Sequence, residues 1–278
     1  MTSTTAERAA ALAGLLARMG GPTKDRFYPE RPSDPDVHAA RTYLEPDQLR
    51  EHAYSTIPAA DRQRVDPRAV VSRFTRAYCM AVVRPVLTAL AIGIPLDASI
   101  ERCAIVWRPW TVREASAMNP FGLWIDLEAW AIPAEGRSPD AVRSDVHTAL
   151  FAGHLARVFA TVLRIAKISP KVLWGNAGEG VGGLATAAAE SLDPAVAQPL
   201  LDVCDRVLTA KTLPGIDGPN PLLDHIGWED VGRADFPHGL MVRRVCCISF
   251  TLPDRVPQIW CGACPLPTTE QRIALVRS

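Results

Sequence analysis

The sequence lacks an excess of charge of either sign. Lysine and arginine together number 30, aspartate and glutamate also number 30, and the formal net charge at pH 7 is zero. Proteins that bind nucleic acid neutralise phosphates with a clustered basic excess, which this composition does not offer. We therefore expect no nucleic acid among its partners.

The sequence also has little that indicates export or a membrane span. Its first eight residues are polar and contain no apolar signal core. The most apolar stretch, residues 77–96, carries Arg84 and Pro85 in its middle, and a charge at that depth is costly in a bilayer. We expect this stretch to be a buried core helix and the protein to be cytoplasmic. Its seven cysteines are then free thiols or metal ligands, because the cytosol keeps thiols reduced.

Most of the sequence shows the hydrophobic periodicity of α-helices. Asp66 followed by Pro67 marks the clearest helix start, since an aspartate cap and a proline in the first turn both favour that position. The pattern predicts helices over residues 5–19, 46–54, 58–64, 67–92, 139–166, from 169 onward, 193–210 and 268–276. Gly-, Pro- and Asp-rich passages predict loops over residues 22–36 and 211–238 and a turn over 253–257.

Two segments change to the period of a β-strand. Residues 100–109 and 122–130 read as paired strands, and residues 241–252 as a further strand. In the second segment Trp124, Asp126, Glu128 and Trp130 then share one face. That face is either a ligand-binding surface or, more simply, a solvated sheet edge with half-buried indoles.

The stretch Gly178-Glu-Gly-Val-Gly-Gly183 matches the pattern G-x-G-x-x-G. A dinucleotide site needs a strand before these glycines and a helix after them. Here Ser169 and Pro170 mark a helix start just upstream. Close helix packing therefore explains the glycines better than a nucleotide does.

Four of the seven cysteines lie within 19 residues near the C-terminus, in the pattern C-C-x13-C-x2-C. Cys261-Gly-Ala-Cys264 is a metal-binding knuckle, in which both sulfurs turn toward one centre. Cys246 and Cys247 are adjacent, and neighbouring side chains of a regular strand point to opposite faces. Either the strand is distorted there, or only one of the two binds a metal.

Three interpretations of these cysteines are possible: a zinc site, a [2Fe–2S] cluster or a vicinal disulfide. A zinc ribbon normally uses a second C-x2-C, which the chain lacks. A [2Fe–2S] cluster presents two separated metal atoms, so adjacent cysteines reach it more easily, and the spacing favours it narrowly over zinc. A vicinal disulfide is disfavoured by the reducing compartment.

The same residues carry a resemblance to a known family. Arg243-Arg244-x-Cys246-Cys247, followed by Trp260-Cys261-Gly-x-Cys264-Pro-Leu, resembles the C-terminal signature of the FhuF-like ferric siderophore reductases. The segment 173–177, Leu-Trp-Gly-Asn-Ala, also resembles those proteins. In that family the two cysteine pairs hold a [2Fe–2S] cluster. The 13-residue gap here is longer than the family's usual spacing, and the turn at 253–257 can accommodate the difference.

We expect an α+β fold: a mostly helical siderophore-binding body with a small antiparallel sheet (residues 1–238) and a C-terminal iron–sulfur module (239–278). The resemblance implies an oxidoreductase that passes one electron to a ferric siderophore, of hydroxamate type, and releases Fe(II) in the cytoplasm. The electron donor would be a ferredoxin or a flavin or NAD(P)H reductase, and peripheral association with a membrane importer is compatible with this role. The alternative is a zinc-stabilised binding or structural protein without redox activity.

The resemblance also implies the site residues. The metal ligands would be Cys246, Cys247, Cys261 and Cys264. From the residues themselves, Arg243 and Arg244 either tune the cluster, the one that faces it more strongly, or are solvated strand charges. Trp260 either shields the cluster from water or is a packing residue. The candidates for lining the siderophore pocket are Trp124, Asp126, Trp130 and Trp174.

Overall fold

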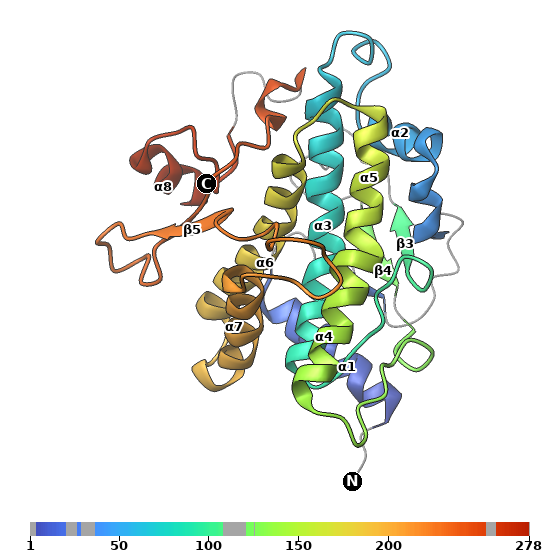
Figure 1. The fold of residues 1–278 in the computed structure, drawn as a ribbon. Helices are drawn as coiled ribbons and strands as arrows, with labels where there is room; N and C mark the ends of the chain where they lie inside the picture. The colour runs from blue at the N-terminus through green and yellow to red at the C-terminus, as the bar shows by residue number, and fades with distance from the viewer. Residues whose placement is uncertain are drawn as a thin grey trace.

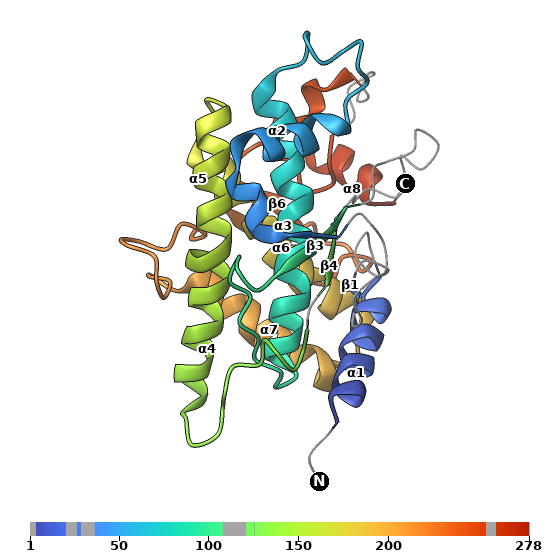
Figure 2. The same cartoon turned by 90° about the vertical axis from the view of Figure 1, so that its right-hand side faces the viewer.

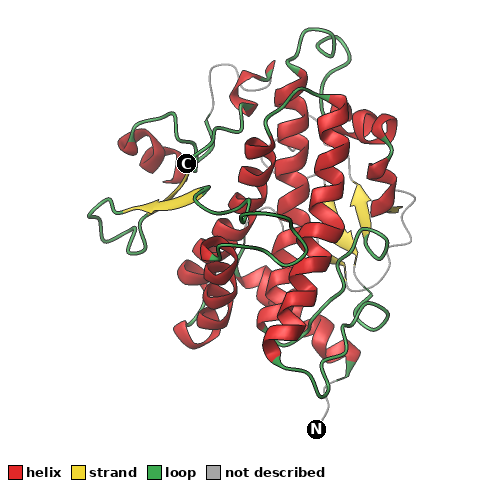
Figure 3. Cartoon of the chain, in the orientation of Figure 1, coloured by secondary structure: helices red, strands yellow, loops and turns green. Residues whose placement is uncertain are grey.

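The structure is a computed structural model that describes residues 4–20, 27–28, 37–107, 121–124, 126–253 and 260–277. It is mostly helical with two small sheets, so the predicted α+β class is confirmed at that level (Figures 1 and 3). The helices are α1 (Thr5–Arg18), α2 (Pro46–Ser55), α3 (Pro67–Ala91), α4 (Pro139–His147), η3 (Thr148–Leu155), α5 (Ala156–Ile165), α6 (Pro170–Ser191), α7 (Pro194–Thr209) and α8 (Thr269–Arg277), with short 3-10 turns η1 (Ala40–Leu44) and η4 (Ser249–Thr251). The strands are β1 (Phe27–Tyr28), β2 (Val37–Ala39), β3 (Ala104–Trp107), β4 (Phe121–Trp124), β5 (Ile226–Glu229) and β6 (Leu240–Arg243).

Helix α3 is the central element of the body. It begins where the sequence predicts, because the Asp66 carboxylate accepts a hydrogen bond from the Arg68 N–H at 2.9 Å and Pro67 occupies the first turn. Nearly every side chain from residue 69 to residue 89 is buried. The most extensive contact of α3 is with α6, which runs beside it (Figure 1).

The glycine-rich stretch lies inside α6, as helix packing predicts, and not in a strand-to-helix turn. A Cβ atom on Gly180 would lie 3.4 Å from Cβ of Val83 on α3. A Cβ on Gly182 would approach the Ile226 and Met241 side chains of the β5–β6 hairpin to 2.9 and 2.8 Å. The missing side chains therefore let α6 approach α3 on one side and the hairpin on the other.

The larger sheet has the strand order β1-β4-β3-β2 and packs against α3 (Figure 2). The predicted antiparallel pairing is confirmed for β3 and β4, with Ala104 opposite Trp124. The predicted second strand is too long, because β4 ends at Trp124. Asp126 accepts hydrogen bonds from the N–H groups of Glu128 and Ala129 at 3.1 and 2.9 Å, which stabilises a turn there. The prediction that residues 124, 126, 128 and 130 share one strand face is therefore wrong.

Residues 139–165 form one continuous helical rod, as predicted, with the π-helical segment η3 between α4 and α5. Among the described residues this rod alone is long and apolar enough to cross a membrane, and 61% of its most apolar window is buried inside the protein. Core helices of soluble proteins pass the same test.

Further sequence predictions differ from the structure. The loop predicted over residues 211–238 contains strand β5. Residues 58–64 form turns and not a helix, with hydrogen bonds from Asp61 N–H to Pro58 O and from Arg64 N–H to Asp61 O, both at 2.9 Å. The strand predicted over 241–252 ends at Arg243. The predicted loop at 22–36 and turn at 253–257 lie largely outside the described residues.

Candidate metal centre

The chain leaves the β5–β6 hairpin before it reaches the first cysteine pair. Strand β6 pairs antiparallel with β5 and ends with Arg243 opposite Ile226. Ile248 has a left-handed backbone (φ 53°), which turns the chain sharply just after Cys246 and Cys247. The two cysteines are therefore not on a regular strand, and the alternation that would send their side chains to opposite faces does not apply.

The second cysteine pair lies alongside the end of β6. The Arg243 N–H donates to the Ala263 carbonyl at 2.9 Å, and the Cys264 N–H donates to the Cys261 carbonyl at 2.9 Å, closing the knuckle turn. Helix α8 packs behind this turn, since a Cβ on Gly262 would lie 3.0 Å from Cγ2 of Val276. The 13-residue gap in the sequence thus separates two segments that meet in space.

The structure brings all four predicted cysteines together. Their sulfurs are in hydrogen-bonding contact in a ring: Cys246 with Cys247 and Cys264, and Cys261 with the same two. Backbone N–H groups also face them, that of Ile248 at 3.3 Å from Sγ of Cys246 and that of Leu266 at Cys264. Cys247 and Cys264 are buried, and the other two are half-buried.

The four thiols shift one another's pKa values in opposite directions. Hydrogen bonds donated by Cys246 and Cys261 lower the pKa of Cys247 far below its ordinary value and lower the pKa of Cys264 to about 3. The pKa values of the two donors are raised, because they keep the shared protons. Four thiolates in contact would repel one another, so the set is stable half-protonated or with positive metal in place of the protons.

The donor set is soft, and thiolate ligands select zinc or iron–sulfur groups. Among the described residues, however, no group of three or more His, Cys, Asp or Glu side chains stands at metal-ligand geometry. The other cysteines, Cys79, Cys103 and Cys204, are buried singly, and burial raises the pKa of each thiol.

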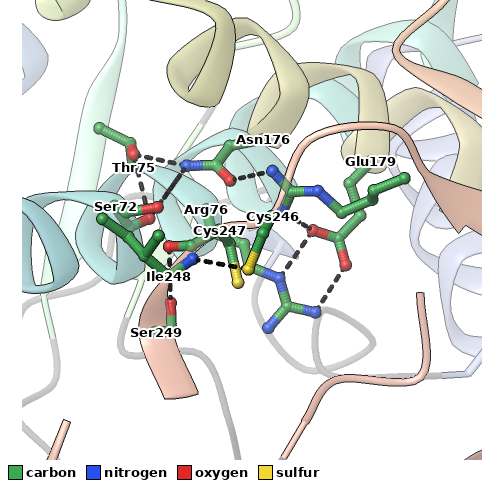
Figure 4. Close-up of polar contacts among 10 residues, drawn as sticks. Ser72, Thr75, Arg76, Asn176, Glu179, Cys246, Cys247, Ile248 and Ser249 are labelled. Carbon is green, nitrogen blue, oxygen red and sulfur yellow. Dashed lines mark hydrogen bonds and ion pairs between the residues drawn. The ribbon is translucent and has the colours of Figure 1, made fainter. Parts of the chain in front are cut away.

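A buried ion network lies beside the sulfurs (Figure 4). Glu179 of α6 accepts hydrogen bonds from Arg243 at 2.7 Å and from Arg76 of α3 at 2.7 and 2.6 Å. Arg243 also donates to Oδ1 of Asn176 at 2.8 Å. Burial opposes ionisation of Glu179, but the charges of Arg76 and Arg243 outweigh it and lower the carboxyl pKa. Both arginines also act on Cys247, whose thiolate they favour.

The two arginines predicted to tune a cluster differ in environment. Arg243 is buried, with 1% of its side chain exposed, and faces Glu179 and the cysteines. Arg244 is exposed, and its backbone N–H donates to the His225 carbonyl at 2.9 Å. Trp260 is half-buried beside Cys261. Its indole N–H and the Nε–H of Arg243 are buried without a hydrogen-bond partner in the part of the chain that the structure describes.

The residues proposed to line a siderophore pocket do not gather at one place. Trp124 and Trp130 pack edge to face with ring centroids 5.1 Å apart, and Trp130 lines a cavity of about 520 Å³. Asp126 caps its own turn. Trp174 lies on α6, where it packs against Phe159 of α5 with centroids 5.0 Å apart.

The residues that sequence reasoning missed are Arg76, Asn176 and Glu179. Asn176 lies in the 173–177 segment. Its side chain accepts a hydrogen bond from Arg243 and donates one to Thr75, both at 2.8 Å. Gly175 leaves room for the Arg243 guanidinium, because a Cβ atom at position 175 would lie 3.2 Å from it. A lone carboxylate at residue 179, inside an apolar glycine-rich helix, was the available signal. Lys, Glu, Arg and Asp are rarely buried unless paired.

The fold and the site define a class of protein, one in which a helical body places buried arginines beside four cysteines. The family described as "ferric iron reductase FhuF-like transporter" matches residues 72–232, more than half of the chain. The chain therefore belongs to the FhuF-like ferric iron reductase family. The matched region includes Arg76, Asn176 and Glu179 and ends before the cysteines. No curated protein matches the chain.

Proposed function

We propose that this protein is an iron–sulfur reductase that transfers one electron to a ferric siderophore, with a [2Fe–2S] cluster held by Cys246, Cys247, Cys261 and Cys264. The observation that carries the proposal is the convergence of these four sulfurs, from two segments separated by 13 residues, beside a body that belongs to a ferric iron reductase family. When bound, such a cluster supplies a one-electron carrier.

The chain's own residues fit this group. Four sulfurs without an oxygen ligand are the donor set that iron–sulfur groups use. The buried N–H groups of Trp260 and Arg243 that have no partner among the described residues would gain acceptors. Arg76 and Arg243 would offset the net negative charge of a thiolate-bound cluster, and that charge would grow by one when the irons take up an electron. Positive charge nearby therefore favours the reduced state.

The proposed reaction changes the charge of the substrate iron and breaks no covalent bond. One electron from the donor, a ferredoxin or a flavin or NAD(P)H reductase, converts bound Fe(III) to Fe(II). Fe(III) is the harder cation and binds the oxygens of a hydroxamate chelator far more tightly, so reduction releases the metal. Cys246 and Cys261 are half-buried, which leaves only a short path between the sulfurs and the surface. We place this reaction in the cytoplasm, with peripheral association to a membrane importer.

The experiment is anaerobic purification followed by visible and EPR spectra and a reductase assay. The reduced protein should reduce a ferric hydroxamate siderophore, with Fe(II) trapped by a ferrous-specific chelator. Replacement of Cys204 by Ala is the matched control, since this thiol is buried away from the ring, and it should keep both colour and activity. A coloured protein that leaves every ferric hydroxamate untouched would contradict the proposed substrate.

A zinc-stabilised binding protein is the alternative, and one observation favours it. Each of the four thiols has two of the others as neighbours, and one tetrahedral zinc ion can also take four thiolates. Such a protein would be colourless and would contain zinc without sulfide.

A further inference from the structure

We infer that Arg76, Glu179 and Arg243 form a charge unit that sets the reduction potential of the sulfur-bound group, with Glu179 as the positioning residue that holds both arginines. The inference rests on the proposed function. It assigns a role to two residues of the body, on α3 and α6, that lie far from the cysteines in the sequence.

The three side chains form a closed ion network with a net charge of +1. Glu179 is 2% exposed and is bound on both sides, through Oε1 and Oε2, by guanidinium groups at 2.6 to 2.7 Å. Arg243 is 1% exposed and Arg76 25% exposed. Figure 4 shows the network beside Cys246 and Cys247, and the charges of Cys247 and Cys261 act on Arg76.

Stability alone does not explain this network. Burying three charges costs desolvation, and well-packed apolar side chains of similar size are often equally or more stabilising. Asn176 already gives the Arg243 guanidinium a neutral partner at 2.8 Å. A second arginine and an ionised carboxylate are needed only if the charge itself has a use, and the partly exposed sulfurs are the nearest groups whose charge would change during the reaction.

The net charge of Arg76, Glu179 and Arg243 predicts the direction in which each variant shifts the reduction potential. Arg76→Gln reduces the net charge of the unit from +1 to zero, disfavours the reduced state and shifts the potential down. Glu179→Gln raises the net charge to +2, keeps a side-chain oxygen that can accept from Arg243, and shifts the potential up. The double variant restores +1 and returns the potential close to that of the wild type. Arg76→Lys keeps the charge and should move it least.

The test is a redox titration of each anaerobically purified variant, followed by visible absorption. Iron content and thermal midpoint are measured on the same samples, because a purely structural role would move these and leave the potential unchanged. Arg68→Gln is the matched control: Arg68 lies on the same helix, is also paired with a carboxylate at 2.7 Å, and is 57% exposed. It should leave the potential unchanged.

Opposite shifts of the two single variants with return in the double variant are the expected result. Unmoved potentials, or shifts of the same sign, would overturn the inference while leaving the reductase proposal intact. If Glu179→Gln does not fold, a lower potential in Arg76→Gln together with an unmoved one in Arg76→Lys decides the question. A colourless wild-type protein instead refutes the proposed function itself.

Discussion

The helical body and the C-terminal segment from β6 to α8 are stabilised in different ways. The body has a continuous apolar core that runs through α1 to α7. In the described part of residues 240–277, only Leu252 belongs to that core as a buried residue. This segment is instead held by the β5–β6 pairing, by the Arg243 network and by hydrogen bonds from Thr269 and Arg272 of α8 to Glu229.

The difference indicates which part of the protein would depend on the proposed cluster for its stability. A segment with few buried apolar residues opens more easily than a packed helical core. Binding that requires the folded form adds stability to the part that forms the site. We therefore expect the metal to stabilise residues 240–277 and to contribute little to the body.

Replacing Cys261 or Cys264 by Ser should have the largest effect. Either change should abolish the visible absorption and the reductase activity and should increase hydrogen exchange in the described part of residues 240–277. Helices α3 and α6 should keep their protection, because their core is independent of the sulfurs. Hydrogen exchange followed by mass spectrometry measures both regions in one experiment. Unchanged brown colour in either variant would refute the ligand assignment.

Acid should destabilise the body through His154. This histidine is fully buried between the Tyr78 hydroxyl at 2.6 Å and the Ala98 carbonyl at 2.8 Å, and burial lowers its pKa from 6.5 to about 4. Its contribution is complete above pH 6.5 and is lost as the pH falls toward 4, because only the unfolded chain binds the proton in that window. The loss should reach about 3 kcal/mol.

Urea unfolding at several pH values checks this expectation. His154→Gln should reduce the dependence and leave the part due to buried His147, whose pKa burial also lowers to about 4. Replacement of the exposed His238 by Gln should leave the dependence unchanged. An equal slope in wild type and His154→Gln would show that other groups carry the pH dependence.

A bulkier residue at position 182 of α6 should push the β5–β6 hairpin, and with it the C-terminal segment, away from the helical body. The Cβ of Val at this position would approach the Met241 and Ile226 side chains to less than 3 Å and push the hairpin from α6. We expect a loss of about 1–3 kcal/mol in the free energy of unfolding, together with reduced iron content. The control is Gly14→Ala on α1, where nothing lies within 4 Å of a new Cβ. That change should be neutral or stabilising, and equal effects at both positions would contradict the packing role of Gly182.

Removing the α3 cap should have the smallest effect and should be confined to the body. Asp66→Ala removes the acceptor of the Arg68 N–H and should cost about 1 kcal/mol. The spectrum of the bound group should not change. A shifted potential in this variant would show that α3 transmits strain to the sulfurs.

Local signals made much of the body predictable. The starts of α3 and α6 follow from an Asp-Pro and a Ser-Pro pair, because caps and first-turn prolines act within one helical turn. The end of β4 was missed because residues 124–130 keep the alternating pattern of a strand while Asp126 turns the chain.

Of the candidate site, only the four cysteines could be predicted from the sequence. The cysteine spacing identified the four that meet, but spacing says nothing about their surroundings. The contacts of Glu179 with Arg76 and Arg243 join residues 103 and 64 positions apart, and no local pattern reports such a contact. For the same reason two adjacent arginines looked equivalent in the sequence, although one is buried at the network and the other is exposed.

The most direct test of the account is elemental analysis of protein purified without oxygen, with acid-labile sulfide measured on the same sample. We expect two irons and two sulfides per chain, lost together when Cys261 is replaced by Ser. One zinc per chain with no sulfide would contradict it.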